Sequence, residues 1–267
     1  RDYYASRGLG DVYKRQIMQC LRSEGGCPWD REQTHESIKK NLIEETYEVI
    51  EAINQQDKAL LCEELGDVLM QVVFHAQMEA EEGSFTFENV ADGVCKKLIE
   101  RHPHVFGEVE VTGSEEVLRN WDDIKKRSKG QTSQTETMLS VPRELPALMR
   151  ATKVQKKAAK VGFDWPDISG AVDKLYEETS ELSGAIESGS EEEIAEELGD
   201  LLFSAVNVSR FVGCDAEEAL TAATDKFMRR FACVEEKARE RGLKLEELSL
   251  SELDALWDEA KLDLLSK

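Results

Sequence analysis

The 267-residue chain lacks the marks of several large protein classes. No apolar run approaches the roughly 20 residues that cross a bilayer, so we expect no membrane partner. Its six cysteines contain no C-x-x-C pair, which disfavours disulfide and zinc frameworks and favours a reduced, cytoplasmic compartment. With 34 basic and 55 acidic residues the net charge is −21, and so acidic a chain is not expected to bind nucleic acid. Glycine-rich phosphate loops of the G-x-x-x-x-G-K-S/T and G-x-G-x-x-G types are absent too.

Proline is also scarce, at five residues, and the strict alternation typical of strands is rare, so the sequence predicts an all-α fold. The apolar residues of 65–72 recur at the i, i+3, i+4, i+7 spacing of one helix face. Ser190 and Asp215 each precede an acidic residue by three positions, as helix N-caps do. We expect helices near 34–55, 57–82, 87–101, 114–127, 144–160, 170–187, 191–212, 216–241 and 250–264.

Composition changes at two places along the chain. Residues 1–16 contain three tyrosines and carry a net positive charge, and our hypothesis is that this atypical segment is a non-native remnant outside the fold. Residues 128–142 are rich in Gln, Thr and Ser without an apolar period, which is typical of a linker. This division predicts an N-terminal domain of residues 17–127 and a C-terminal domain of residues 143–267.

The two halves of the chain repeat each other. The segment EETYE at 44–48 matches EETSE at 177–181, and EELGDVL at 63–69 matches EELGDLL at 196–202. Both matches have the same offset of 133 residues (178 minus 45). A register shared across two helices and their connection implies two copies of one helical module.

Each copy places two acidic residues three positions apart on one helix and two more on the next. Residues at i and i+3 share a helix face, so two antiparallel helices would bring four carboxylates together. Mg²⁺ takes oxygen ligands of this kind, usually with water and substrate phosphates. The predicted metal ligands are Glu45, Glu48, Glu64 and Asp67 in the first copy and Glu178, Glu181, Glu197 and Asp200 in the second.

A solvated helix face is the ordinary explanation for such a run in a chain that is 33% charged. Three observations favour a metal site instead, and the repetition of the whole set is the first. Glu45 lies on the apolar stripe of its helix, where a lone carboxylate is costly without a cation or hydrogen bonds. Gly66 and Gly199 each cost a helix about 1 kcal/mol relative to Ala, so we expect another backbone or a ligand to come close there.

The negative charge of the four carboxylates indicates which further ligand a metal ion bound there would hold. Four carboxylates repel one another and repel a polyphosphate, and divalent cations between them remove both repulsions. Lys226 and Arg230 stand four apart on a later helix and could neutralise further phosphate charge, although a solvated basic face is an equal alternative. Trp257 could stack on a base, or it could be a core residue.

At this point the motifs resemble a known family. E-E-x-x-E followed by E-x-x-D, present twice, is similar to the MazG nucleoside triphosphate pyrophosphohydrolases. Three further segments resemble the two-domain members of that family: GCPWD at 26–30, RHPHVF at 101–106 and VGFDW at 161–165. The resemblance extends from about Ile17 over nearly the whole chain.

This resemblance implies an all-α fold of two tandem modules, in which four-helix bundles are completed by homodimerisation. It implies Mg²⁺-dependent hydrolysis of nucleoside triphosphates, ATP among them, to monophosphate and pyrophosphate as nucleotide-pool housecleaning, with Mn²⁺ as a substitute ion. As in the two-domain members, the C-terminal copy would be the active one, and Asn41, which stands where the second copy has Lys174, fits a weaker or inactive first site. The implied catalytic residues are Glu177, Glu178, Glu181, Glu197 and Asp200, with Glu177 or Glu178 orienting the water. The implied nucleotide contacts are Lys174, Glu177, Lys226, Arg230 and Trp257.

Two other classes of function remain open from the residues alone. A di-iron carboxylate bundle needs E-x-x-H motifs, and only Glu32 to His35 fits, outside the repeat. A non-enzymatic acidic adaptor would use its helices to bind a protein, and neutralising Glu197 or Asp200 would then leave its function intact.

Overall fold

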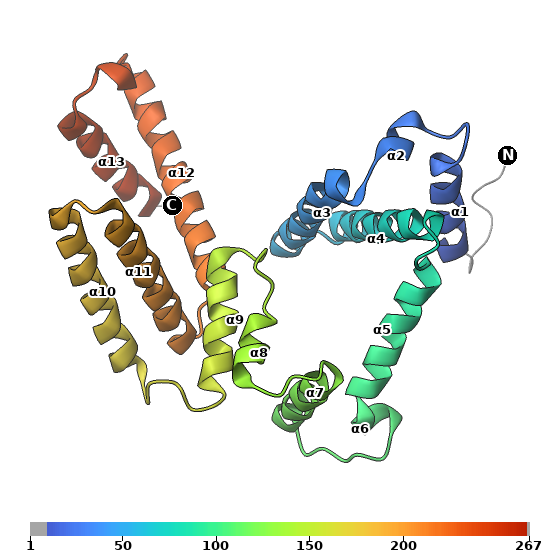
Figure 1. Cartoon of the computed structure of the whole chain (residues 1–267). Coiled ribbons are helices and arrows are strands. Elements are labelled where there is room, and N and C mark those ends of the chain that lie inside the picture. The colour runs from blue at the N-terminus through green and yellow to red at the C-terminus, as the bar shows by residue number, and fades with distance from the viewer. Residues whose placement is uncertain (1–9, 266–267) are drawn as a thin grey trace. The chain divides into compact units, whose positions relative to one another are not determined.

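A computed structural model describes the backbone of residues 10–265 and the side chains of residues 15–263 (Figure 1). None of the described residues lies in a β-strand, which confirms the predicted all-α fold. No helix in this part of the chain combines the length and the apolar character needed to cross a membrane. The chain divides into two compact units, Arg1–Lys125 and Lys126–Lys267, and each is described by itself.

The N-terminal unit is built on a hairpin of two long helices, α3 and α4, with α1 packed against α4 (Figure 1). Gln56 takes a left-handed conformation with φ of 56° between them, and the Asp57 carboxylate then caps α4. The described helices are α1 (Gly10–Arg22), α2 (Pro28–Glu32), α3 (His35–Gln55), α4 (Lys58–Glu81), α5 (Phe87–Arg101), α6 (Pro103–Phe106) and α7 (Ser114–Ser128). The core consists of Met18, Ile38, Val73, Phe74 and Met78, with Phe87 beside it.

The C-terminal unit repeats the long hairpin as α10 and α11 (Figure 1). Gly189 turns the chain with φ of 76°, and the Ser190 hydroxyl accepts the Glu193 amide at 3.3 Å, as the cap prediction requires. The elements are α8 (Gln134–Leu139), α9 (Ala147–Ala159), α10 (Ile168–Ser188), α11 (Glu191–Phe211), α12 (Ala216–Glu240), a 3-10 turn (Leu245–Glu247) and α13 (Leu250–Leu265). A separate core between α12 and α13 consists of Val234, Ala238, Leu256 and Ala260.

All nine expected helices are present, and their ends agree with the expectation to within three residues. The structure differs in two segments. Residues 10–16 begin α1, so this part of the atypical N-terminal segment is helical and leads directly to the buried Met18; residues 1–9 lie outside the described part. The stretch 128–142 contains α8, which is fixed by reciprocal capping between Ser133 and Glu136 and by the burial of Thr137.

Candidate metal and nucleotide site

The hairpin of α10 and α11 brings three acidic side chains of the repeat to one place. Glu178 lies on α10, whereas Glu197 and Asp200 lie one turn apart on α11. One carboxylate oxygen from each of the three lies within 4.8 Å of the others. Only 4% of Glu178 is exposed, Glu197 is half-buried and Asp200 is exposed, so the group opens from the helix interface toward solvent. We call this group, together with Glu181, the C-terminal acidic cluster.

Like charges in this cluster disturb the titration of Glu197. Burial raises the pKa of Glu197 above its ordinary value, and the neighbouring carboxylates of Glu181, Glu178 and Asp200 raise it further. Glu181 is exposed and stands one turn from Glu178, so it joins the group through this electrostatic interaction. Because burial and like charge both disfavour the ionised form of Glu197, a proton or a metal cation bound there would relieve the repulsion.

The hairpin of α3 and α4 forms an equivalent N-terminal acidic cluster. Oxygens of Glu45, Glu48 and Glu64 lie within 4.8 Å of one another. Burial, Asp67 and Glu48 raise the pKa of Glu45, while burial, Glu48 and Asp67 raise that of Glu64. Asp67 therefore takes part through this electrostatic interaction only, as Glu181 does in the other cluster, whereas Asp200 itself belongs to the converging oxygens.

A lysine marks the main difference between the two clusters. Lys174 Nζ lies 2.7 Å from Glu177 Oε1 and 2.6 Å from Glu178 Oε1. These two hydrogen bonds raise the pKa of Lys174 above its ordinary value, so the amine stays charged. In the N-terminal cluster Asn41 occupies the matching position, and Glu45 instead accepts a hydrogen bond from the buried amide of Gln71.

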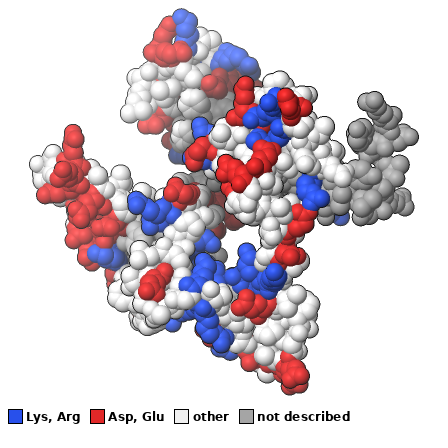
Figure 2. All heavy atoms as spheres, turned by 45° about the vertical axis from the view of Figure 1, so that its right-hand side comes forward, with Lys and Arg blue, Asp and Glu red and all other residues white. Residues whose placement is uncertain are grey.

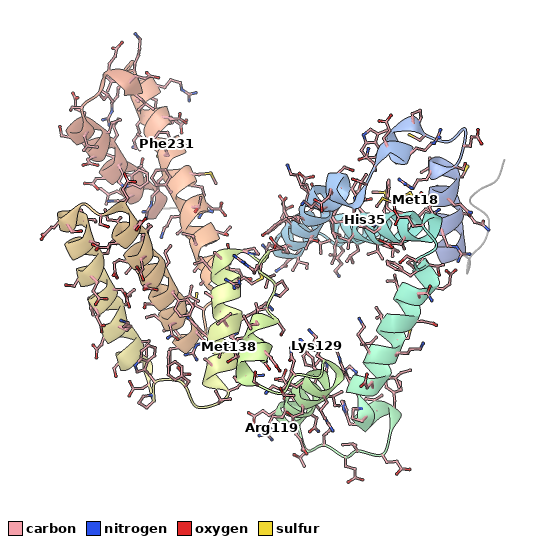
Figure 3. All side chains as sticks on the ribbon, viewed as in Figure 1. Met18, His35, Arg119, Lys129, Met138 and Phe231 are labelled. Carbon is pink, nitrogen blue, oxygen red and sulfur yellow. The ribbon has the colours of Figure 1, made fainter. Side chains whose placement is uncertain are left out.

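The predicted nucleotide contacts on α12 and α13 lie together, but no described ion pair joins them to the acidic cluster. The Arg230 guanidinium stands 5.9 Å from the centroid of the Trp257 ring, and Phe227 lies 5.1 Å from the same ring. Trp257 packs against the core between α12 and α13, where Phe231 of α12 continues the aromatic row (Figure 3). Lys226 is exposed on α12. Of the two roles that the sequence left open for Trp257, the structure shows packing against the core.

The donor set of the acidic clusters suits a hard cation. Both clusters offer carboxylate oxygens only, and none of the described histidines belongs to either group. The E-x-x-H segment places His35 elsewhere, at the start of α3 (Figure 3). There its Nε2 lies 3.0 Å from Glu79 Oε1 and its Nδ1 lies 2.7 Å from His75 Nδ1. These contacts do not build the di-iron motif, and the residues present fit Mg²⁺ or Mn²⁺.

Acidity by itself does not single out these two places. Figure 2 shows acidic side chains dispersed over the visible face among basic and uncharged ones. The convergence of carboxylates from two helices, with raised pKa values, distinguishes the clusters from that background.

The surroundings of the clusters bear on the interior glycines and on one further polar residue. A Cβ atom added to Gly66 or Gly199 would meet nothing within 4 Å, so no other part of the single chain comes close to either glycine, and a close ligand or second copy there stays a prediction. Gln71 had no recognised role in the sequence. Its side chain is buried against Glu45, and its Oε1 has no hydrogen-bond partner in the described structure. A single polar residue on an apolar stripe was its only signal.

Comparison with known proteins gives a consistent assignment. The profile of the MazG nucleotide pyrophosphohydrolase domain matches residues 33–106 and 169–234, which include both acidic clusters. The chain is 48% identical over 245 residues to "Nucleoside triphosphate pyrophosphohydrolase/pyrophosphatase MazG" of Thermotoga maritima, covering 92% of this chain and 93% of the relative.

Two further relatives match the same share of this chain. "Nucleoside triphosphate pyrophosphohydrolase" of Escherichia coli K12 is 46% identical over 248 residues, covering 92% of this chain and 94% of that protein. "Uncharacterized protein YabN" of Bacillus subtilis is 50% identical over 248 residues, which are 92% of this chain and 50% of the relative.

Proposed function

This chain belongs to the MazG nucleotide pyrophosphohydrolase family, and we propose that it hydrolyses nucleoside triphosphates to nucleoside monophosphate and pyrophosphate. The observation that carries the proposal is the C-terminal acidic cluster beside Lys174, which lies within the second segment that the family profile matches. In the cell this reaction would remove unwanted nucleotides from the cytoplasmic pool.

We assign the metal to the four carboxylates of the C-terminal acidic cluster, Glu178, Glu181, Glu197 and Asp200. A bound Mg²⁺, or Mn²⁺ in its place, supplies a water of lowered pKa and neutralises charge on the phosphates. The side chains then position the reactants. Glu177 is exposed next to the cluster and belongs to no group of ligand atoms. Its Oε1 pairs with Lys174, and we assign its carboxylate the role of orienting the attacking water.

Cationic side chains would hold the phosphates of the substrate. Lys174 reaches the edge of the cluster from α10, where its ammonium pairs with Glu178, and from there it would contact a phosphate of the substrate. Lys226 and Arg230 extend this role if α12 approaches the hairpin in the substrate complex. Trp257 would stack on the base of the nucleotide while keeping its contact with Phe227.

We also propose a homodimer. The hairpin of α10 and α11 leaves large apolar side chains exposed that a second copy could cover. These are Tyr176, Ile186, Leu198, Leu202 and Phe203. An apolar face of this kind on a two-helix hairpin is typical of a four-helix bundle that is completed by association.

A panel of nucleoside triphosphates with Mg²⁺, scored for monophosphate and pyrophosphate, tests the proposed reaction. We expect one monophosphate for each pyrophosphate. We expect Glu178→Gln and Asp200→Asn to abolish the release of pyrophosphate, because each removes a ligand charge. The matched changes Glu45→Gln and Asp67→Asn should have much smaller effects. Equal losses from both clusters would contradict the assignment of the active copy.

A further inference from the structure

The equivalent carboxylates of the two acidic clusters, Glu178 and Glu45, accept hydrogen bonds from different donors. In the C-terminal cluster, the ammonium of Lys174 lies 2.6 Å from Glu178 Oε1. In the N-terminal cluster the uncharged Asn41 stands at the position of Lys174, and Glu45 accepts a hydrogen bond from the uncharged amide of Gln71, which lies on α4. The C-terminal cluster therefore contains a positive charge of its own, whereas no ion pair among the described residues brings one to the N-terminal cluster.

Lys174 has the properties of a cation that can be exchanged. Glu178 is 4% exposed, and its carboxylate, which offers an oxygen to the candidate metal group, accepts from Lys174 through Oε1. The side chain of Lys174 is 36% exposed and comes from the same helix, so its flexible stem can carry the charge out of the cluster without unfolding α10. An ammonium and a divalent ion held by the same carboxylate lie close together and repel each other, so each weakens the binding of the other.

We propose that Lys174 is an internal competitor of the metal ion at Glu178, and that a polyphosphate relieves the competition by drawing the ammonium away. Metal and nucleotide then bind cooperatively in the C-terminal unit. The N-terminal cluster, which has the uncharged Asn41 in place of Lys174, binds a divalent ion without needing a nucleotide. This inference rests on the proposed function, because it requires the C-terminal carboxylates to be metal ligands.

The effect can be measured as a change in metal affinity. Replacing Lys174 by Met keeps most of the stem but removes the charge. For an ion pair of this exposure, we expect Mn²⁺ to bind the C-terminal cluster about three- to ten-fold more tightly. By linkage, the nucleotide must raise the Mn²⁺ affinity of the unchanged protein by more than that of the Met variant.

Mn²⁺ binding to the whole chain, followed by electron paramagnetic resonance of the free ion, gives a readout that is independent of catalysis. The C-terminal cluster is read in the background Glu64→Gln, Asp67→Asn, in which the other cluster has lost two charges. In that background we expect Lys174→Met to bind Mn²⁺ more tightly, whereas Lys174→Arg, which keeps the charge, stays close to the unchanged protein. Unfolding midpoints of the variants exclude a trivial loss of fold.

The N-terminal cluster provides the mirror experiment. In the background Glu197→Gln, Asp200→Asn, the change Asn41→Lys introduces the missing ammonium and should weaken Mn²⁺ binding by about the same factor. If Mn²⁺ binds but Lys174→Met is no tighter than the unchanged protein, the competition is refuted while the metal site stands. If Mn²⁺ binds in neither background, the proposed metal site itself fails, and the competition with it.

Discussion

The substitution Gly199→Ala should affect the stability of the single chain and the stability of the proposed homodimer in opposite directions. Gly199 lies inside α11, and an added methyl group would meet nothing within 4 Å. An interior glycine costs a helix about 1 kcal/mol relative to alanine, so the variant should gain about that much stability. For a unit of this size, the gain corresponds to an unfolding midpoint higher by about 2–4 °C.

The assay compares unfolding with self-association. Leu198 and Leu202, the exposed residues around Gly199, are 46% and 49% exposed and belong to the face that we assign to a second copy. If that copy approaches closely at Gly199, the methyl group will weaken the dimer while it stabilises the dilute chain. Gly184→Ala is the matched control, since Gly184 is also an open interior glycine, on α10. Calorimetry of dilute samples and light scattering at micromolar concentration give the two readouts. A lowered midpoint for Gly199→Ala in dilute samples would refute the reasoning.

Three other changes test particular contacts. Because burial and then neighbouring carboxylates raise the pKa of Glu197 above 4.5, protons should compete with Mn²⁺, and affinity measured by calorimetry should fall as the pH is lowered from neutral toward 5. Burial and then His35 lower the pKa of His75 below 6.5, so the free energy of unfolding of the protein should fall as the pH falls below 6.5. The change His75→Phe should flatten that part of the plot of stability against pH. A methyl group on Gly170 would overlap the Trp165 ring, so Gly170→Ala should lower the unfolding free energy by about 1–3 kcal/mol in a denaturant titration.

Long amphipathic helices could be predicted from the sequence because their signal is repeated over many residues. The α5 helix, for example, begins and ends where its apolar spacing and the Thr86 cap place it. The six residues of α8 are too few to show a helical period, and the polar composition around them is typical of a linker. Its one local signal was a Ser133-x-x-Glu136 capping box, which the structure shows to be formed.

The carboxylates of the two clusters could be predicted because i, i+3 spacing and an antiparallel hairpin determine their convergence. Their partners could not, since the contact of Gln71 with Glu45 depends on how two helices are rotated against each other. The pairing of Lys174 with Glu178 was compatible with their spacing of four, but the same spacing occurs at many solvated pairs. The approach of α12 to the acidic cluster is a tertiary property and stays a prediction.

The most direct test of the account is anomalous diffraction from crystals grown with Mn²⁺ and a non-hydrolysable nucleoside triphosphate. We expect manganese peaks between the carboxylates of Glu178, Glu197 and Asp200, with the phosphates on their open side and Lys174 turned from Glu178 toward a phosphate oxygen. Manganese and nucleotide bound elsewhere, with these carboxylates facing bulk water, would contradict the account.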